Sequence, residues 1–116
     1  MPTHINRQRE PRQEPIVLAS ADGAIVAYSG VVMITKGTAA ALTLAAPLTA
    51  THDGYRLTIV STSAAAHTVT QTTPGFNNGS TASDVATYGA AIGNTLELVA
   101  YNGKWYVTNT IGVTLA

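Results

Sequence analysis

The stretch TLELVAYNGKWYVTNT, residues 95–110, carries the strongest structural signal in the chain. At its centre, Asn102-Gly103 lies between alternating apolar and polar side chains. Both residues of a two-residue type I′ turn need a positive φ, which Asn and Gly adopt readily, so this pattern predicts a β-hairpin. The predicted cross-strand pairs are Tyr101 with Lys104, Val99 with Tyr106 and Leu98 with Val107.

Alternation along this hairpin separates a core face from an outer face, because successive side chains of a strand point to opposite sides. The residues of the predicted core face are Leu96, Leu98, Ala100, Trp105 and Val107. The opposite face carries Glu97, Lys104 and Thr108 together with three residues that we predict to form an oligomer interface: Val99, Tyr101 and Tyr106. A register slip of one residue would expose Trp105, so the predicted register is firm.

The rest of residues 16–116 consists of short apolar and Thr-rich stretches separated by turn residues. Its many Thr and Val residues have β-branched side chains that fit a pleated sheet. Turn signals recur about every 8–12 residues, which is typical of an antiparallel sandwich or barrel. Even the Ala-rich segment AAALTLAAPLTA, residues 39–50, favours a strand, because Leu42 alternates with Leu44 and Pro47 follows. We therefore predict an all-β fold, a small antiparallel β-sandwich or barrel, for residues 16–116.

Residues 1–15, MPTHINRQREPRQEP, differ in composition from the rest of the chain and are predicted to form an extended N-terminal arm. They hold five of the twelve charged residues and three of the five prolines. Proline removes a backbone donor and restricts the residue before it, so regular strand pairing is unfavourable here. Two interpretations stay open, namely a terminus without fixed structure and a docking arm that orders on a partner.

The composition of residues 16–116 argues against several classes of partner and chemistry. Three Lys or Arg residues stand against four Asp or Glu residues, and the resulting net charge of −1 does not suit a nucleic-acid-binding surface. The chain has no Cys, which excludes thiol chemistry and thiolate metal ligands. No apolar run reaches about 18 residues and the first residues are polar, so we expect neither a membrane span nor a secretion signal.

No motif in the sequence predicts catalysis, a metal or a cofactor. The three histidines, His4, His52 and His67, lack the close spacing and the neighbouring carboxylates of a metal site. His52-Asp53 is interpreted as a polar turn, and His67 is expected to pack at an edge or an interface. No Gly-x-Ser-x-Gly elbow is present, and GFNNGS at residues 75–80 lacks the Lys and the helix of a phosphate loop. We therefore expect a protein that is not an enzyme.

Three segments carry a family resemblance: DGYRLTIV at residues 53–60, AHTVT at 66–70 and GNTLELVAYNGKWY at 93–106. Together they resemble a small β-rich module of tailed-bacteriophage virion proteins, in particular of head-decoration (cement) proteins. The resemblance extends over residues 35–108 and rests on positions that build the fold. It implies a homotrimer that binds the major capsid protein on the outer surface of the head and is made in the cytoplasm of the host bacterium. Such a protein needs no cofactor, membrane or nucleic acid.

The resemblance also implies a role for residues 1–15, because the N-terminal segment of such proteins commonly contacts the shell. We expect Ile5, Arg7, Arg9 and Arg12 to form a capsid-binding arm. Its guanidinium groups would pair with carboxylates, and its extended backbone would add a strand to an exposed sheet edge. The expected location is therefore the virion, at the outer capsid surface.

Two other hypotheses remain. Similar modules occur in phage tail fibres and appendages, where the chain would bind a host receptor or glycan through exposed tyrosines and the Phe76–Ser80 loop. Tyr88, Tyr101, Trp105 and Tyr106 would then form a platform for a sugar ring, whereas the competing interpretation places Trp105 in the core and the tyrosines at an interface. A bacterial carbohydrate-binding module is the third hypothesis, and the absence of a secretion signal counts against it.

Overall fold

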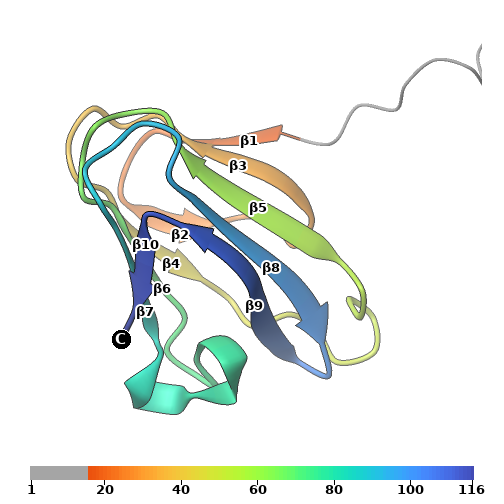
Figure 1. Cartoon of the computed structure of the whole chain (residues 1–116). Coiled ribbons are helices and arrows are strands. Elements are labelled where there is room, and N and C mark those ends of the chain that lie inside the picture. Colours follow the sequence, from red (N-terminus) through yellow and green to blue (C-terminus); the bar gives the residue numbers. More distant parts are fainter. Residues whose placement is uncertain (1–15) are drawn as a thin grey trace, which may run out of the picture.

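The computed structural model describes residues 16–116 and shows two five-stranded β-sheets packed face to face (Figure 1). The predicted all-β class is confirmed. The predicted N-terminal arm, with Ile5, Arg7, Arg9 and Arg12, lies outside the described residues. Sheet A contains, in spatial order, β1 (Ile16–Ala19), β3 (Gly30–Ile34), β5 (Arg56–Ser61), β8 (Thr95–Tyr101) and β9 (Lys104–Ile111). Sheet B contains β10 (Val113–Leu115), β7 (Val85–Tyr88), β6 (Thr68–Thr70), β4 (Ala41–Leu44) and β2 (Gly23–Ile25).

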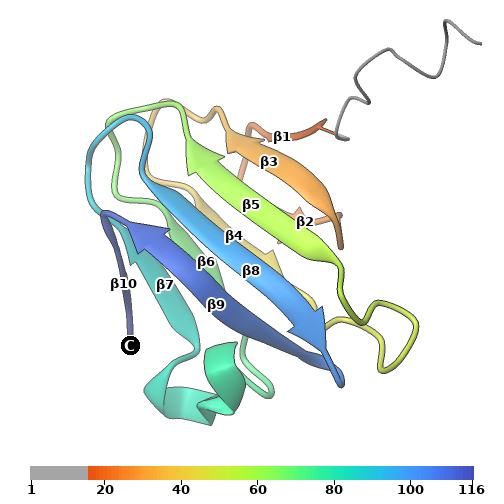
Figure 2. The ribbon, with the colours of Figure 1, turned by 45° about the vertical axis from the view of Figure 1, so that its right-hand side comes forward.

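From β1 to β6, each strand lies in the opposite sheet from the strand before it, so the chain winds back and forth between the layers. Figure 2 shows sheet A with β1 at one edge and β9 at the other. Because of this winding, β1, β3 and β5 run parallel in sheet A, and β2, β4 and β6 run parallel in sheet B. Strands β7 to β10 then extend both sheets by antiparallel pairing.

The sheets are therefore mixed, and the predicted antiparallel arrangement is wrong for the first six strands. The physical reason is that the connections cross between layers instead of turning back within one sheet. Each strand then pairs with a strand distant in sequence, as Val31 of β3 does with Thr58 of β5. Local turn signals predict where a strand ends, but they do not show which layer the chain enters next.

The core lies between the two sheets, because alternate side chains of the strands point inward. Trp105 on β9 is fully buried, and its Nε1–H donates to the carbonyl of Ala45 at 2.9 Å. This confirms the core position predicted for Trp105. The largest fully buried apolar side chains are Trp105, Tyr88, Phe76, Ile34, Leu42, Leu57, Ile59, Leu96 and Leu98.

The C-terminal hairpin of β8 and β9 forms with the predicted register. The pairs are Tyr101 with Lys104, Val99 with Tyr106 and Leu98 with Val107. Asn102 and Gly103 have φ angles of 53° and 76°, in the left-handed region that a type I′ turn requires. Further from the turn the ladder shifts, because Glu97 pairs with Asn109 and leaves Thr108 as the extra residue of a β-bulge.

Candidate interaction surfaces

The side of sheet A that points away from sheet B carries the three residues predicted as an oligomer interface. Val99 and Tyr106 are direct cross-strand partners, and Arg56 of β5 pairs with Val99 from the other side. Tyr101 lies at the hairpin end of the same face, and its side chain is 60% exposed. The structure therefore places Val99, Tyr101 and Tyr106 on one surface, and their role as an interface stays a prediction.

Five further apolar residues lie on this face, and the hairpin pattern did not reveal them. Leu18, Met33 and Val60 are aligned across β1, β3 and β5, and Ile16 is paired with Val31 in a neighbouring row. The continuous apolar run VVMI at residues 31–34 could have indicated apolar residues on the outer face. A strand that is covered on both faces lacks the usual alternation of apolar and polar residues. We define the outer apolar face of sheet A as Ile16, Leu18, Val31, Met33, Val60, Val99, Tyr101 and Tyr106.

The outer face of sheet B has a different character, because threonine occupies most of its positions. One row across the sheet consists of Ala41, Thr68, Thr87 and Thr114. The neighbouring row consists of Ala24, Thr43, Thr70 and Val85. Hydroxyl groups and small side chains suit contact with water, whereas a contiguous apolar face suits a protein partner. The two outer faces of the sandwich are thus chemically distinct.

The loop between β4 and β5 approaches the tip of the β8–β9 hairpin. The ring of His52 in this loop stacks on Tyr28 of the β2–β3 connection, with ring centroids 4.2 Å apart. The centroid of the His52 ring lies 5.0 Å from that of Tyr55. Asp53 Oδ1 accepts the backbone N–H of Asn102 at 2.8 Å and so ties the loop to the hairpin. The polar turn predicted at His52-Asp53 is confirmed, and both side chains serve local structure.

His67 lies in the interior, so the prediction that it packs at an edge or an interface is wrong. Its burial is possible because both ring nitrogens have partners. Nδ1 accepts the N–H of Ala40 at 3.0 Å, and Nε2 lies 3.0 Å from Ser63 Oγ. Since the Ser63 hydroxyl donates to the carbonyl of Lys36 at 2.6 Å, Nε2 carries the proton and donates to the Ser63 oxygen. The network therefore assigns a neutral Nε2–H imidazole.

This network holds Ser63 and His67 in an arrangement unsuited to nucleophilic catalysis. A serine nucleophile needs an unprotonated imidazole nitrogen facing its hydroxyl. Here the nitrogen facing Ser63 bears the proton, and the serine proton is directed to a backbone carbonyl. Burial, followed by the nearby charge of Lys36, lowers the pKa of His67 and favours the neutral ring.

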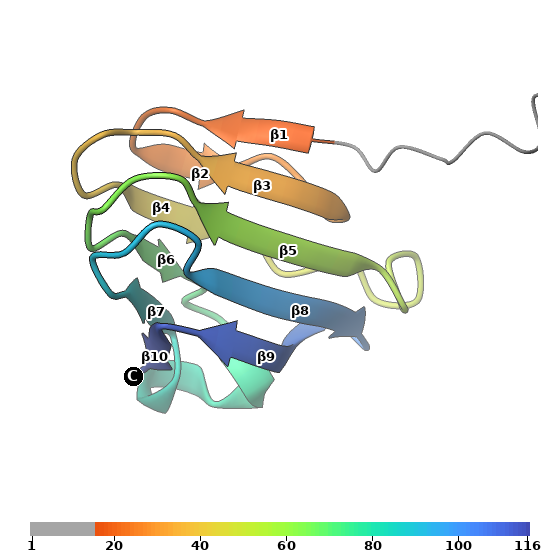
Figure 3. The same ribbon diagram turned by 45° about the horizontal axis from the view of Figure 1, so that its top comes forward.

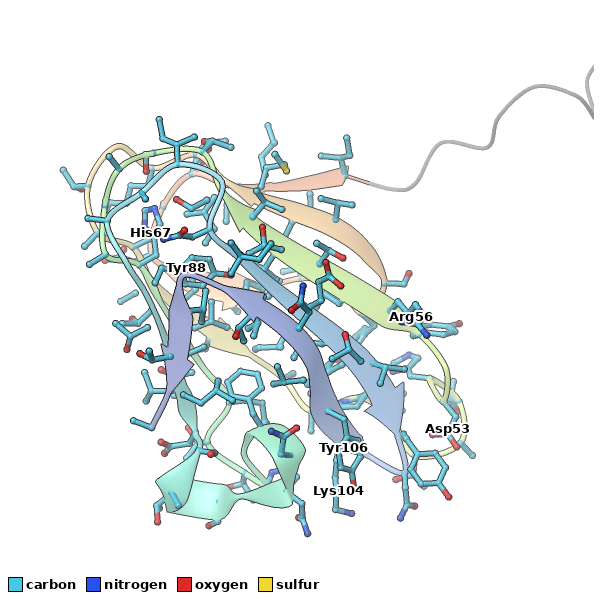
Figure 4. The ribbon with its side chains drawn as sticks, in the orientation of Figure 1. Asp53, Arg56, His67, Tyr88, Lys104 and Tyr106 are labelled. Carbon is cyan, nitrogen blue, oxygen red and sulfur yellow. The ribbon has the colours of Figure 1, made fainter. Side chains whose placement is uncertain are left out.

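Tyr88 is also buried, which corrects its predicted place at an interface. Its hydroxyl donates to the carbonyl of Ile59 at 2.7 Å, and its ring meets His67 edge-on at 6.3 Å (Figure 4). Burial raises the pKa of the Tyr88 hydroxyl. Because Tyr88 and Trp105 both lie in the core, the four-residue platform for a sugar ring is not formed.

Two short 3-10 helices, η1 (Phe76–Asn78) and η2 (Ser80–Ala82), connect β6 to β7, and η1 lies beside β9. Phe76 is fully buried, so the main aromatic residue of the predicted Phe76–Ser80 binding loop is unavailable to a ligand. Asn77 Oδ1 accepts the backbone N–H of Val107 at 2.8 Å. This segment therefore covers the β9 edge of sheet A.

Comparisons with known proteins add no relative to this picture. No family model matches the chain, and no curated protein matches it. Among residues 16–116, no helical segment has the length and apolar composition needed to cross a bilayer.

Proposed function

We propose that this chain is a structural virion protein, a bacteriophage capsid decoration protein that binds the outer surface of the mature head as a homotrimer and stabilises it. The observation that carries the proposal is the contrast between the two outer faces of the sandwich. On sheet A, apolar side chains lie on β1, β3 and β5 and again at the β8–β9 hairpin, with Thr58 and Glu97 between the two groups. Sheet B presents a threonine face, and this contrast is expected for a subunit with one side against its copies and the other against water.

The outer apolar face of sheet A also carries charges that suit contact between copies. Arg56 and Lys104 lie on it together with Glu97, so both signs of charge are present on one surface. When three copies surround a three-fold axis, a guanidinium of one copy can face a carboxylate of the next. Val99 and Tyr106, between these charges, supply the apolar contact.

The N-terminal arm supplies the contact with the shell in this proposal. Ile5, Arg7, Arg9 and Arg12 bind carboxylates and an exposed strand edge of the major capsid protein. Three arms on one trimer act at a high effective concentration, so individually weak contacts give firm binding. Binding only to the expanded shell stabilises it by mass action against internal pressure.

Analytical ultracentrifugation of the purified full-length chain at low concentration tests the trimer. The expected mass is three times that of the 12.0 kDa chain. Val99→Glu places a charge in the apolar face and should yield 12.0 kDa monomers, whereas Thr87→Glu, a matched change on the face of sheet B, should leave the trimer intact. A monomeric wild type, or equal behaviour of the two variants, would contradict the proposed interface.

Binding of the purified protein to isolated heads tests the arm. Deletion of residues 1–15 should leave the oligomer folded and abolish its co-sedimentation with heads. Circular dichroism and the sedimentation mass serve as the folding control. Undiminished binding of the shortened chain would show that another surface contacts the shell.

One observation favours the alternative of a tail fibre or appendage module. Tyr55 of the β4–β5 loop and Tyr101 at the end of β8 are both exposed, and Asp53 ties that loop to the hairpin beside Tyr101, so exposed aromatic residues are present at that end. A host receptor or glycan would bind there independently of residues 1–15. Retention of host-envelope binding by the shortened chain, and its loss in Tyr101→Ala, would support this alternative over decoration.

A further inference from the structure

The two ends of the sandwich differ in how they are closed. At the β9–β10 end, η1 lies against β9, with Phe76 buried and Asn77 bonded to the strand. At the opposite end, β1 and β2 are the outermost strands of their sheets (Figure 3). Among residues 16–116, no element follows them there, so both strands present an unpaired edge.

The space between these two edges is an apolar groove that reaches the core. Its lining includes Val17, Ala19, Ile25, Val32 and Leu42. Large apolar side chains are also exposed around it: Ile16 and Leu18 are each 65% exposed, and Val26 is 82% exposed. A stack of strands that ends without a cap leaves such a surface uncovered.

The backbone of β1 is arranged to accept another strand. The carbonyl of Ala19 accepts the N–H of Thr35 at 2.9 Å, so Ala19 directs its backbone groups toward β3. Because these groups alternate in direction along a strand, those of Ile16 and Leu18 point to the open edge. Lysine, internal proline and β-bulges are the usual protection of an edge, and β1 has none of them.

We propose that this open end binds the same end of a second copy of the chain. A two-fold axis perpendicular to the sheets places the two β1 strands antiparallel and brings the two β2 edges together through the same rotation. Val17 lies at the axis, facing the partner's Val17 in a non-hydrogen-bonded pair. Ile16 exchanges both backbone hydrogen bonds with the partner's Leu18, and the partner's Ile16 does the same with Leu18.

The charges at this end favour a second copy as the occupant. Strands β1 and β2, with the sequences IVLA and GAI, carry no ionisable side chain. The adjacent Asp22 is paired with Lys36 at 2.9 Å, so its charge is balanced within its own copy. Within residues 16–116, a two-fold axis therefore brings no unbalanced like charges together at β1 and β2, and the exposed Ile16 and Leu18 cover each other.

This contact goes beyond the proposed function, because it is made through the free backbone edge of β1 and through Val17, which is not part of the face proposed for the trimer. Ile16 and Leu18 are shared with the margin of that face. Only two short strands take part, so the association is expected to be weak and concentration-dependent. In a homotrimer it would join neighbouring trimers. A chain that had lost the trimer contact would still form a dimer through the contact at the β1–β2 end.

Cysteine cross-linking tests the axis directly, because the chain has no cysteine of its own. In Val17→Cys, the two sulfur atoms meet across the axis, since Cα atoms of a non-hydrogen-bonded pair lie about 4.5 Å apart. Oxidation of the full-length variant at high concentration should yield a covalent dimer. Thr114→Cys, on the β10 edge strand at the other end, serves as the matched control. Equal cross-linking of both variants, or none in Val17→Cys, would overturn the proposal.

Sedimentation at increasing concentration gives a second test that is separate from the trimer. The Val99→Glu background is used, because there the trimer contact is already lost and the overlap of Leu18 with the outer apolar face has no effect on the readout. In this background the mass should double as concentration rises, an added Leu18→Lys should abolish the doubling, and an added Thr114→Lys should retain it. Combining Val99→Glu with Val17→Cys separates the two interfaces, because loss of the trimer should leave the cross-link unchanged. The same measurement on the chain without residues 1–15 distinguishes another occupant. If the mass doubles for that shortened chain but not for the full-length chain, residues 1–15 occupy the open end and the proposal is wrong.

Discussion

Lowering the pH from about 7.5 to about 5.5 is expected to destabilise the fold through His67. In the folded chain the imidazole is neutral, accepts the N–H of Ala40 at Nδ1 and donates to Ser63 from Nε2. A second proton at Nδ1 would turn this acceptor into a donor that faces another donor. Burial of the ring and, secondly, the charge of Lys36 also lower the pKa of His67. The folded protein therefore resists a proton that the unfolded chain readily binds.

The size of the effect follows from proton linkage. The unfolded His67 has an ordinary pKa of about 6.5, so the neutral ring contributes its full stability above that pH. As the pH falls below this value the unfolded state binds the proton first, and the free energy of unfolding decreases by up to about 1.4 kcal/mol per pH unit. The decrease stops only when the pH reaches the lower pKa of the folded state. Between about pH 7.5 and 5.5, the expected loss is at most about 1.4 kcal/mol, which is the limit for a folded state that binds no proton in this range.

Urea unfolding of the wild type and of His67→Gln across this range measures the contribution. Glutamine retains an acceptor for Ala40 and a donor for Ser63 but does not titrate. Asp22, whose pKa is lowered by the Lys36 ammonium and the Ala41 N–H, loses its contribution only at more acidic pH. The other two histidines are present in both proteins and cancel in the comparison. Equal pH slopes for the two proteins would refute the assigned role of His67.

Three further substitutions test the packing, each by chemical denaturation. Trp105→Ala should lower the free energy of unfolding by about 3–5 kcal/mol, because the ring is fully buried, and a loss well below about 1 kcal/mol would contradict its core position. Tyr88→Phe should cost about 1–3 kcal/mol by leaving the carbonyl of Ile59 without its partner, so an unchanged midpoint would argue against that hydrogen bond. Gly103→Ala should cost about 1–2 kcal/mol at a φ of 76°, and no loss would be inconsistent with the type I′ turn.

The parts of the fold that local chemistry dictates could be predicted from the sequence. The Asn102-Gly103 pair needs a positive φ at both positions, which fixes the turn and, with alternation, the register of the hairpin. The burial of Trp105 follows from the same alternation. The β-branched composition and the spacing of turn residues are also local properties, and they correctly indicated an all-β chain.

Features that depend on distant residues could not be predicted in this way. The parallel pairing of β3 with β5 is determined by where the chain crosses between layers, and Val31 and Thr58 share no sequence signal. The burial of His67 depends on Ala40, a residue distant in sequence that satisfies Nδ1, as well as on Ser63 in the same connection between β5 and β6, which satisfies Nε2. For the candidate surface, the hairpin revealed Val99, Tyr101 and Tyr106, whereas the apolar residues of β1 and β3 join them only through long-range pairing.

The point at which the arm enters the fold has a mechanical consequence. Among residues 16–116, β1 is an edge strand that is bonded to β3 alone, and in the sequence it directly follows residues 1–15. A force transmitted along the axis of β1 strains every hydrogen bond of this short ladder at once, whereas a force that lifts Ile16 away from the sheet breaks them one after another. A decoration protein held by its arm would accordingly resist sliding across a shell more strongly than it resists being peeled off.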